Sequence, residues 1–433
     1  MTIELDRRLM LKASAALMAS NSVRARQGLP AATAADIPPS DRIRLAFMGV
    51  NGRGLALIRS FMAAKGTEVA TICDVDSRAA AKAAEVVAKG QSQPAKIEKD
   101  IRRVLEDASV DAIVVAAPNH WHAPATILGC TAGKHVYVEK PLSQTAEEGE
   151  LAIRAARKHD RVVQMGSQRR SRKGVIEGIA KLHGGEIGEV LYARTWYNNR
   201  RDPIGKGNAT PVPEWLDWDL WQGPAPRRPY VDNVVHYNWH WHWHWGGGEL
   251  ANNGIHGLDV ARWGLGVTFP SRVTAGGGKY RYDDSQETPD TMMATYDFPE
   301  GKTITWEGLS WSPLGARDSG FGVTFHGTQG SMAILDAGYV TFDMKNKQTG
   351  AGDGAGGEAD HVGDFLNRIR EGGRPNADVE EGHRSTLLCH LGNIALRTES
   401  VLKIDPNNGH ILDHPAAQKL WSRDYDNDWR PNV

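Results

Sequence analysis

Chemically active side chains are densest in His236–Trp263, which reads HYNWHWHWHWGGGELANNGIHGLDVARW. His240, His242 and His244 are spaced by two, so on an extended chain they would share one face, and His-x-His on a strand can bind zinc. Trp occupies the alternating positions, and Glu249 is the one acid nearby. The same residues also fit a sugar-binding surface, a catalytic centre or a packed aromatic ribbon. Since histidines beside a polar ligand donate hydrogen bonds without a metal, we expect no metal here.

The second part of this stretch changes from period two to helical spacing. A helix is predicted from about Asn253, and Asn252 and His256, four residues apart, would lie on one face of it. An imidazole there can act as a general base. The amide of Asn252 can orient that imidazole or a substrate hydroxyl. Unlike a carboxylate, it cannot place a negative charge beside the imidazolium that forms.

The first half of the chain contains elements that could position such a centre. A buried parallel strand is predicted at Arg42–Val50, followed by a glycine-rich turn, a helix and a second apolar run that ends at Asp74. Gly49, Asn51 and Gly54 occupy the G-x-G-x-x-G positions, with Asn in the middle place. This order predicts a dinucleotide fold whose turn binds pyrophosphate. Asp74 would bind the ribose hydroxyls and repel a 2′-phosphate, which favours NAD over NADP.

The remaining sequence shows two successive patterns of secondary structure. Strand–helix alternation continues to about position 166, with a helix expected from Ala123, and period-two strands dominate after Gln168. Lys345–Asp360 is rich in glycine and predicts a flexible loop. We therefore expect a leader and linker (1–40), an α/β Rossmann domain (41–166), and an α+β domain with a large, mainly antiparallel sheet and C-terminal helices (167–433).

Composition and the N-terminus limit the partners. Net charge is −1, no long basic run occurs, and no stretch of 18 apolar residues exists, so neither nucleic acid nor a membrane span is expected. Three cysteines without a CxxC spacing predict no disulfide framework. DRRLMLKASAALMAS resembles a twin-arginine export signal, with departures at Asp6 and Met10. It predicts recognition by the twin-arginine machinery and a periplasmic location; the alternative is cytoplasmic.

The motifs together resemble the Gfo/Idh/MocA oxidoreductase family from Arg42 to the C-terminus. The resemblance is carried by the glycine turn, Asp74, PNHWH (Pro118–His122), EKP (Glu139–Pro141) and NNGIHGLD (Asn252–Asp259). It implies that Lys140 and His256 are catalytic. It also places Asn252 where many members have Asp, and Asp259 at a later conserved acid position of the family motif.

The resemblance implies a nicotinamide cofactor and a carbohydrate substrate. Candidate catalytic residues are Lys140, His256 and Asn252. Candidate cofactor-binding residues are Gly49, Asn51, Gly52, Arg53, Gly54, Asp74, Pro118, Asn119, His122, Glu139 and Lys140. Because aromatic faces stack on sugars and polar side chains bind their hydroxyls, the candidate substrate-binding residues are Trp121, Trp196, Tyr197, His240, Trp241, Asp259 and His383.

Several functions remain open at this stage. The first is hydride transfer between a carbohydrate and a tightly bound NAD that is recycled in each turnover, because the periplasm supplies little free nucleotide. The second is an NAD-dependent glycosidase, as in the family 109 branch, which uses transient oxidation at C3 and elimination. The others are a plain dehydrogenase and a non-catalytic sensor or scaffold. The family implies a homodimer or homotetramer formed through the second-domain sheet.

Overall fold

The computed structural model describes residues 42–336, 338–354, 356–426 and 429–433. The twin-arginine-like leader lies outside the described residues. Within the described part of the chain, no helix has both the length and the apolar character needed to cross a membrane.

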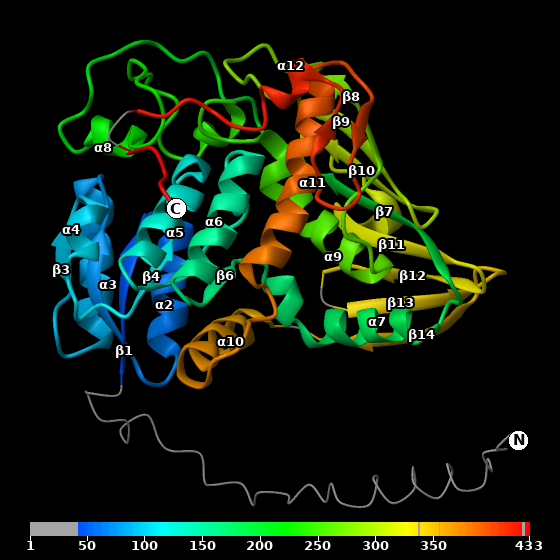
Figure 1. Cartoon of the computed structure of the whole chain (residues 1–433), viewed down its shortest axis with the longest axis horizontal. Coiled ribbons are helices and arrows are strands. Elements are labelled where there is room, and N and C mark those ends of the chain that lie inside the picture. Colours follow the sequence, from blue (N-terminus) through cyan, green and yellow to red (C-terminus); the bar gives the residue numbers. More distant parts are fainter. Residues whose placement is uncertain (1–41, 337, 355, 427–428) are drawn as a thin grey trace, which may run out of the picture. The chain divides into compact units, whose positions relative to one another are not determined.

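A six-stranded parallel sheet forms the first layer (Figure 1). In spatial order its strands are β3 (Lys96–Glu98), β2 (Thr67–Cys73), β1 (Ile43–Met48), β4 (Ala112–Val115), β5 (His135–Val138) and β6 (Val163–Met165). Every pairing is parallel, which gives the doubly wound order with a switch point between β1 and β4. The apolar run that contains β1 is buried on both faces, as a central parallel strand requires.

Helices flank this sheet, as the strand–helix alternation predicts. They are α2 (Arg53–Ala63), α3 (Ser77–Gly90), α4 (Ile101–Leu105), α5 (Asn119–Thr131) and α6 (Ala146–Lys158). The expected start of α5 at Ala123 is wrong by four residues, because Asn119–His122 of the PNHWH motif form the first helical turn, after Pro118. Much later in sequence, α10 (Glu358–Glu371) returns to this layer, where Val362 and Phe365 join its apolar core.

A ten-stranded sheet forms the second layer. Its spatial order is β14 (Gln348–Asp353), β13 (Gly338–Asp343), β12 (Gly330–Ile334), β11 (Phe321–Gly327), β7 (Val190–Asn198), β10 (Lys302–Leu309), β9 (Thr291–Phe298), β8 (Arg272–Gly278), β15 (Leu402–Ile404) and β16 (Ile411–Leu412). Among the described strands of this second sheet, only β7 and β10 pair in parallel, so the mainly antiparallel sheet is confirmed. The glycine-rich segment predicted as a loop contains β14, because it pairs with β13.

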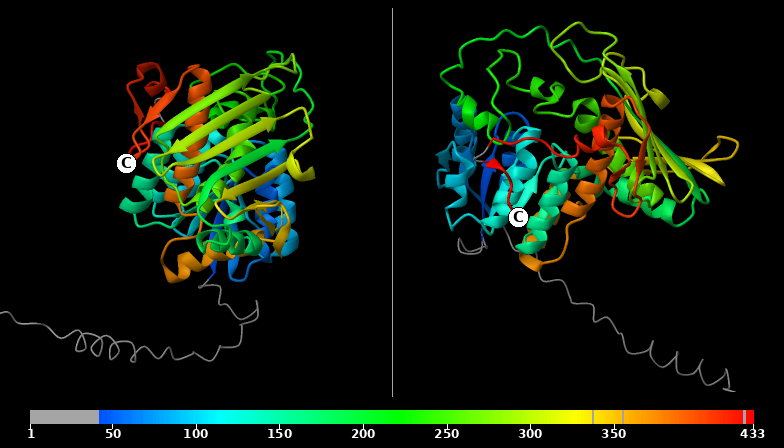
Figure 2. Two further views of the ribbon diagram at one scale, coloured as in Figure 1. Left: turned by 90° about the vertical axis from the view of Figure 1, so that its right-hand side faces the viewer. Right: turned by 45° about the horizontal axis from the view of Figure 1, so that its top comes forward.

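Helices connect the two sheets. One face of the large sheet is covered by α7 (Lys173–His183), α9 (Ile255–Leu265) and α11 (Val379–Arg397), as Figures 1 and 2 show. The π-helical turn η4 (Leu250–Gly254) runs directly into α9, and η2 (Gln168–Ser171) follows β6. Two short elements, η5 (Ala316–Asp318) and α12 (Pro415–Gln418), lie in later connections. Chain segments that carry Asn252 and His256 are thereby packed on a rigid core.

Residues 199–247, here called the cover segment, connect β7 to η4 and return over the carboxyl edge of the parallel sheet. The segment contains α8 (Trp218–Gln222) and η3 (Asn238–Trp241). Leu216 forms a β-bridge with Asp76, and the N–H of Asp217 donates to the carbonyl of Val75. Trp218, Trp221 and Trp245 form the centre of an apolar cluster inside the segment. Figure 1 shows α8 beside the upper ends of α4 and α5.

Candidate active site

A cavity of about 590 Å³ lies at the carboxyl edge of the parallel sheet. Its wall comes from the turns after β1, β2, β4 and β5, from the cover segment, and from η4 and α9. Open α/β folds bind their ligands at this edge, at the switch point of the strand order. We call this space the first cavity.

The glycine turn builds one end of the first cavity from backbone. Gly49 has φ of 78°, and a Cβ there would lie 2.6 Å from the backbone nitrogen of Ala117. A Cβ on Gly54 would lie 1.9 Å from the Gly49 carbonyl oxygen, so this glycine permits close packing of α2 and does not itself line the cavity. Gly52 faces open space, and the N-terminus of α2 has no side-chain cap. Uncapped N–H groups and the helix dipole suit a pyrophosphate.

The acidic residues after β2 form the neighbouring wall. Asp74 lines the cavity, and its carboxylate accepts hydrogen bonds from the N–H groups of Val50 (2.6 Å) and Asp76 (2.8 Å). Burial raises the pKa of Asp74. Asp76 bonds the His236 imidazole at 2.8 Å and pairs with Arg78. Burial opposes ionisation of Asp76, but the bonds from Arg78 and His236 outweigh it and lower its pKa to about 2.

Lys140 and Asn252 meet at the opposite end of the cavity. The Lys140 ammonium donates to the Asn252 carbonyl oxygen at 2.7 Å and to its side-chain oxygen at 3.0 Å. Burial lowers the pKa of Lys140. The Asn at position 252 therefore has Lys140 as its partner, and it holds the ammonium without neutralising its charge.

His256 lines the same end of the cavity from the first turn of α9. Burial, followed by the positive charge of Lys140, holds the pKa of His256 well below its ordinary value. The imidazole is thus neutral at physiological pH and can accept a proton.

The PNHWH and EKP segments brace one another beneath this end. The His122 ring nitrogens lie 2.5 Å from the Pro141 carbonyl oxygen and 2.8 Å from that of Ala117. Glu139 is buried and accepts from Arg53 at 2.8 Å. These contacts of His122 and Glu139 hold the strand ends around the cavity. Asn51, Pro118 and Asn119 line it as well.

Two predicted substrate residues line the cavity. Trp121 is buried, and its indole N–H donates to the Trp221 carbonyl at 3.0 Å. His240 stacks on Trp239 with ring centroids 3.5 Å apart, and burial lowers the pKa of His240 to about 3. Both side chains therefore contribute neutral ring surface to the wall.

The aromatic predictions in β7 and η3 need correction, because three of these side chains are outside the cavity lining. Trp196 is fully buried in the sheet and donates to the Ser319 carbonyl. Tyr197, on the same strand, accepts a bond from Asn199. Trp241 is fully buried beneath Arg201, whose guanidinium lies 3.5 Å from the ring centroid. Sugar stacking was inferred from residue type, whereas the rings of Trp196 and Trp241 are buried in the packed interior.

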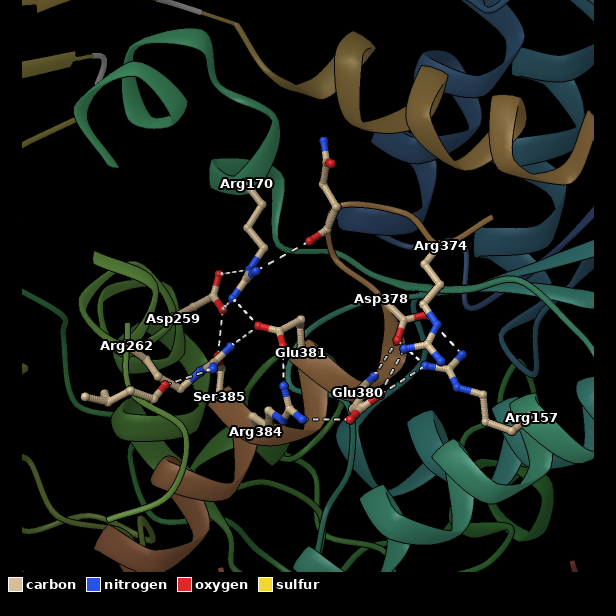
Figure 3. A network of polar contacts seen from close by, with 12 residues as sticks. Arg157, Arg170, Asp259, Arg262, Arg374, Asp378, Glu380, Glu381, Arg384 and Ser385 are labelled. Atoms are coloured by element: carbon tan, nitrogen blue, oxygen red, sulfur yellow. Dashed lines mark hydrogen bonds and ion pairs between the residues drawn. The ribbon is translucent and has the colours of Figure 1, made fainter. Parts of the chain in front are cut away.

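Asp259 and His383 also lie outside the cavity lining. Asp259 forms a buried bidentate pair with Arg170, and Ser385 donates to it at 2.6 Å. Figure 3 shows this pair within a larger ionic network that joins α9, α11 and the segment after β6. His383 packs against Gly149, and burial lowers its pKa to about 4. Both side chains are buried between helices in this structure.

Sequence reasoning missed several wall residues. His236, Tyr237 and Trp239 line the cavity from the cover segment, and Trp429 lines it from the C-terminal tail. Tyr237 has φ of 81°, a strained value of the kind found at functional sites. Its place in the aromatic stretch was a signal that could have found it. Trp429 carried no such signal, since only folding brings the tail against Trp121, with centroids 4.9 Å apart.

The alternating histidines do not form the extended ribbon that would align them. Asn238–Trp241 is a 3-10 turn, and His244 contacts the Pro226 carbonyl at 2.8 Å, away from His240. The Glu249 carboxylate accepts hydrogen bonds from the Asn253 amide and the Ser310 hydroxyl. In the part of the chain that the structure describes, no group of three or more His, Cys, Asp or Glu residues is arranged to hold a metal.

The fold and this cavity define a dinucleotide-binding oxidoreductase architecture. Residues 43–167 match the model of the Gfo/Idh/MocA oxidoreductase family's NAD-binding Rossmann fold, and residues 180–431 match its C-terminal alpha/beta domain. The chain belongs to the Gfo/Idh/MocA oxidoreductase family.

Individual relatives are more distant. A glycosyl hydrolase family 109 protein from Shewanella sp. (strain ANA-3) is 31% identical over 159 residues. That match covers 33% of this chain and only 35% of the relative. Aldose-aldose oxidoreductase from Caulobacter crescentus, solved with glycerol, superposes with a TM-score of 0.65 at 19% identity, over 84% of this chain and 100% of that one. The WlbA dehydrogenase from Bordetella pertussis, solved with NADH and UDP-GlcNAcA, gives 0.64 at 19%, over 84% and 99%.

Proposed function

We propose that this protein is an NAD-dependent oxidoreductase that acts on a carbohydrate or sugar derivative. One observation carries the proposal: the first cavity joins a glycine-built anion cradle to the hydrogen-bonded Lys140–Asn252 pair and a neutral His256. A dinucleotide needs the first feature, and alcohol oxidation needs the second. The aldose-aldose oxidoreductase and the dehydrogenase solved with UDP-GlcNAcA support the substrate class through the shared fold.

The cradle fits the pyrophosphate because it offers uncapped N–H groups and room where side chains are missing. Asp74 retains acceptor capacity toward ribose hydroxyls, and a negative group there disfavours a 2′-phosphate. These features support NAD over NADP. When bound, the nicotinamide supplies the hydride acceptor.

The chain's own residues handle the substrate oxygen. His256 accepts the hydroxyl proton on its imidazole, because its pKa keeps it neutral. Lys140 stabilises the negative charge that develops on that oxygen. Asn252 holds the ammonium in place through its two oxygen acceptors. Tyr237 and His240, whose centroids are 4.7 Å apart, form the wall on the cover-segment side.

Tight retention of the cofactor is part of the proposal. The cover segment contributes Trp221 and Trp239 to the cavity wall, and the tail contributes Trp429. Burying a nucleotide beneath two segments that pack on the body slows its release. This arrangement suits recycling of one cofactor, which a protein exported by the twin-arginine route would need. Export to the periplasm and assembly into a homodimer or homotetramer are further parts of the proposal.

An NAD-dependent glycosidase is the second candidate, favoured by the likeness to a family 109 protein. In that reaction oxidation at C3 acidifies the C2 proton, the glycosidic oxygen leaves by elimination, water adds, and C3 is reduced again. The products show no net redox change. Deuterated water separates the candidates, because elimination labels C2 of the released sugar and simple hydride transfer does not.

The test of the main proposal is turnover by the purified full-length protein and His256→Asn. The assay offers sugar pairs without added nucleotide, then single sugars and polyols with NAD. Expected is product formation by the wild type and loss of turnover in the variant, with its nucleotide retained. Retained nucleotide without turnover on any sugar or glycoside would contradict the proposal and favour a sensor or scaffold.

A further inference from the structure

A second cavity of about 680 Å³ is lined by Gln144 and Thr145, which follow Lys140 in the chain, and by part of the cover segment. Lys140 and His240 line the first cavity, whereas Gln144 and Trp243 line the second. Gln144 donates to the carbonyl oxygens of Trp243 and Gly246, both at 3.0 Å, so the two segments form a bonded wall between the cavities. The second cavity plays no part in the proposed redox function.

Its wall is rich in positive charge. Arg397, Lys419, Arg423 and Arg430 line it, against the single carboxylate of Asp424. Arg423 is committed to the buried Glu148 at 2.6 Å. Among the described residues, Arg397 and Lys419 form no ion pair with a carboxylate. Cations gathered in a concave site attract an anion, and guanidinium groups bind carboxylates well.

Two amides in the same wall need hydrogen-bond donors. The amino groups of Gln144 and Asn393 are fixed by backbone carbonyls, including a bond from Asn393 to Gly247 at 2.8 Å. Their carbonyl oxygens are buried and have no partner within the described protein. An unsatisfied buried acceptor destabilises the fold. These acceptors lack donors, and a second anion would supply none.

An aromatic ring completes the set. Trp243 is partly exposed in this wall, and the Arg397 guanidinium lies 5.0 Å from its ring centroid. Indole surfaces pack against the C–H face of a sugar ring. The cations exclude a preference for neutral sugars, and the acceptors and ring distinguish the site from one for a simple inorganic anion.

We propose that the second cavity binds an acidic saccharide, a sugar that carries a carboxylate, through Arg397 and Lys419. The inference stands independently of the redox proposal, because it uses residues outside the first cavity.

Isothermal titration of the full-length, cofactor-loaded protein tests it, with glucuronate, glucose and inorganic phosphate as probes. We expect glucuronate to bind at least about tenfold more tightly than either of the others, and the double variant Arg397→Ala/Lys419→Ala to weaken it at least about tenfold. Arg59→Ala/Lys89→Ala removes two exposed cations from outer helices of the first layer and serves as the matched charge control. It should bind like the wild type.

Lys140→Ala separates the two cavities, and it should leave glucuronate binding unchanged. Binding lost in Lys140→Ala but retained in the Arg397/Lys419 variant would place the ligand in the first cavity and overturn the inference. Equal binding of glucose would overturn the charge argument, and equal binding of phosphate would overturn the saccharide argument. If the charge control Arg59→Ala/Lys89→Ala weakened glucuronate binding equally, the loss of affinity would come from net charge and not from this site.

Discussion

The two ends of the first cavity are built from different materials. At the glycine end the wall is backbone: Gly49 and Gly52 have positive φ, and Gly54 lets α2 approach the turn. At the other end the wall is side chain, where Lys140 is held by Asn252. The glycine end thus depends on positions that have no side chain, and the far end depends on particular side chains.

The two ends therefore suit different tasks: the glycine end suits binding a ligand, and the far end suits reacting with it. A backbone cradle offers fixed N–H groups that no rotamer change can move, so it suits the constant part of a ligand. Buried side chains have perturbed pKa values, so they suit proton transfer. Substitutions at the two ends should therefore fail differently: loss of nucleotide at one, loss of turnover with nucleotide retained at the other.

The largest effect is expected for Lys140→Ala. Removing the ammonium removes the charge that stabilises the developing oxyanion, and kcat should fall about 10³-fold. Nucleotide content, measured by chromatography after denaturation, should be unchanged. Lys134→Ala is the matched control, since Lys134 is buried in the same layer and donates to the Asp107 carbonyl outside the cavity. Equal losses in both variants would remove the catalytic role.

Gly49→Ala should break the opposite end. The new Cβ meets backbone at 2.6 Å in a residue with φ of 78°, so the turn must move and nucleotide affinity should fall about 10²-fold. Gly133→Ala is the control, because φ is 76° there but a Cβ meets nothing within 4 Å. It should lose only the stability cost of the strained φ, about 1 kcal/mol. Full nucleotide occupancy in Gly49→Ala would contradict the cradle.

A change in pH dependence is expected for Asn252→Asp. A carboxylate beside Lys140 stabilises its ammonium and raises a pKa that burial now lowers. Activity that needs the ammonium is lost as pH rises through that pKa, so the basic limb should move upward by about one unit, a tenfold change in proton concentration. Asn252→Ala should not move it upward. An upward shift of the acidic limb instead would show that deprotonated Lys140 is the active form, because activity that needs the free amine appears only above its pKa.

The smallest effect is expected where the tail touches the cavity. Trp429→Ala opens a gap beside Trp121, and nucleotide release, followed by stopped-flow fluorescence, should be about five- to tenfold faster. Trp421→Ala removes an equally large ring that packs on His410 instead. Identical release rates in both variants would show that the tail does not retain the cofactor.

The glycine end was readable from sequence, and the far end only partly. Gly49, Gly54 and Asp74 are close together in the chain, so local spacing encodes their geometry. His256 was found through its motif, but its neighbour Tyr237 was missed. Trp196 and Trp241 were assigned to a sugar by residue type, yet tertiary packing buries both. Asp259 was assigned to substrate binding from its place in the motif, because its partner Arg170 is 89 residues away in the chain and local spacing does not reveal the pair.

The most direct measurement is to purify the full-length protein, denature it, and identify any released nucleotide by chromatography and mass. The account predicts close to one NAD or NADH per chain. Titration of any empty fraction with NAD should restore that ratio. A protein that carries no nucleotide and does not bind added NAD or NADP would contradict the central claim, whatever its activity on sugars.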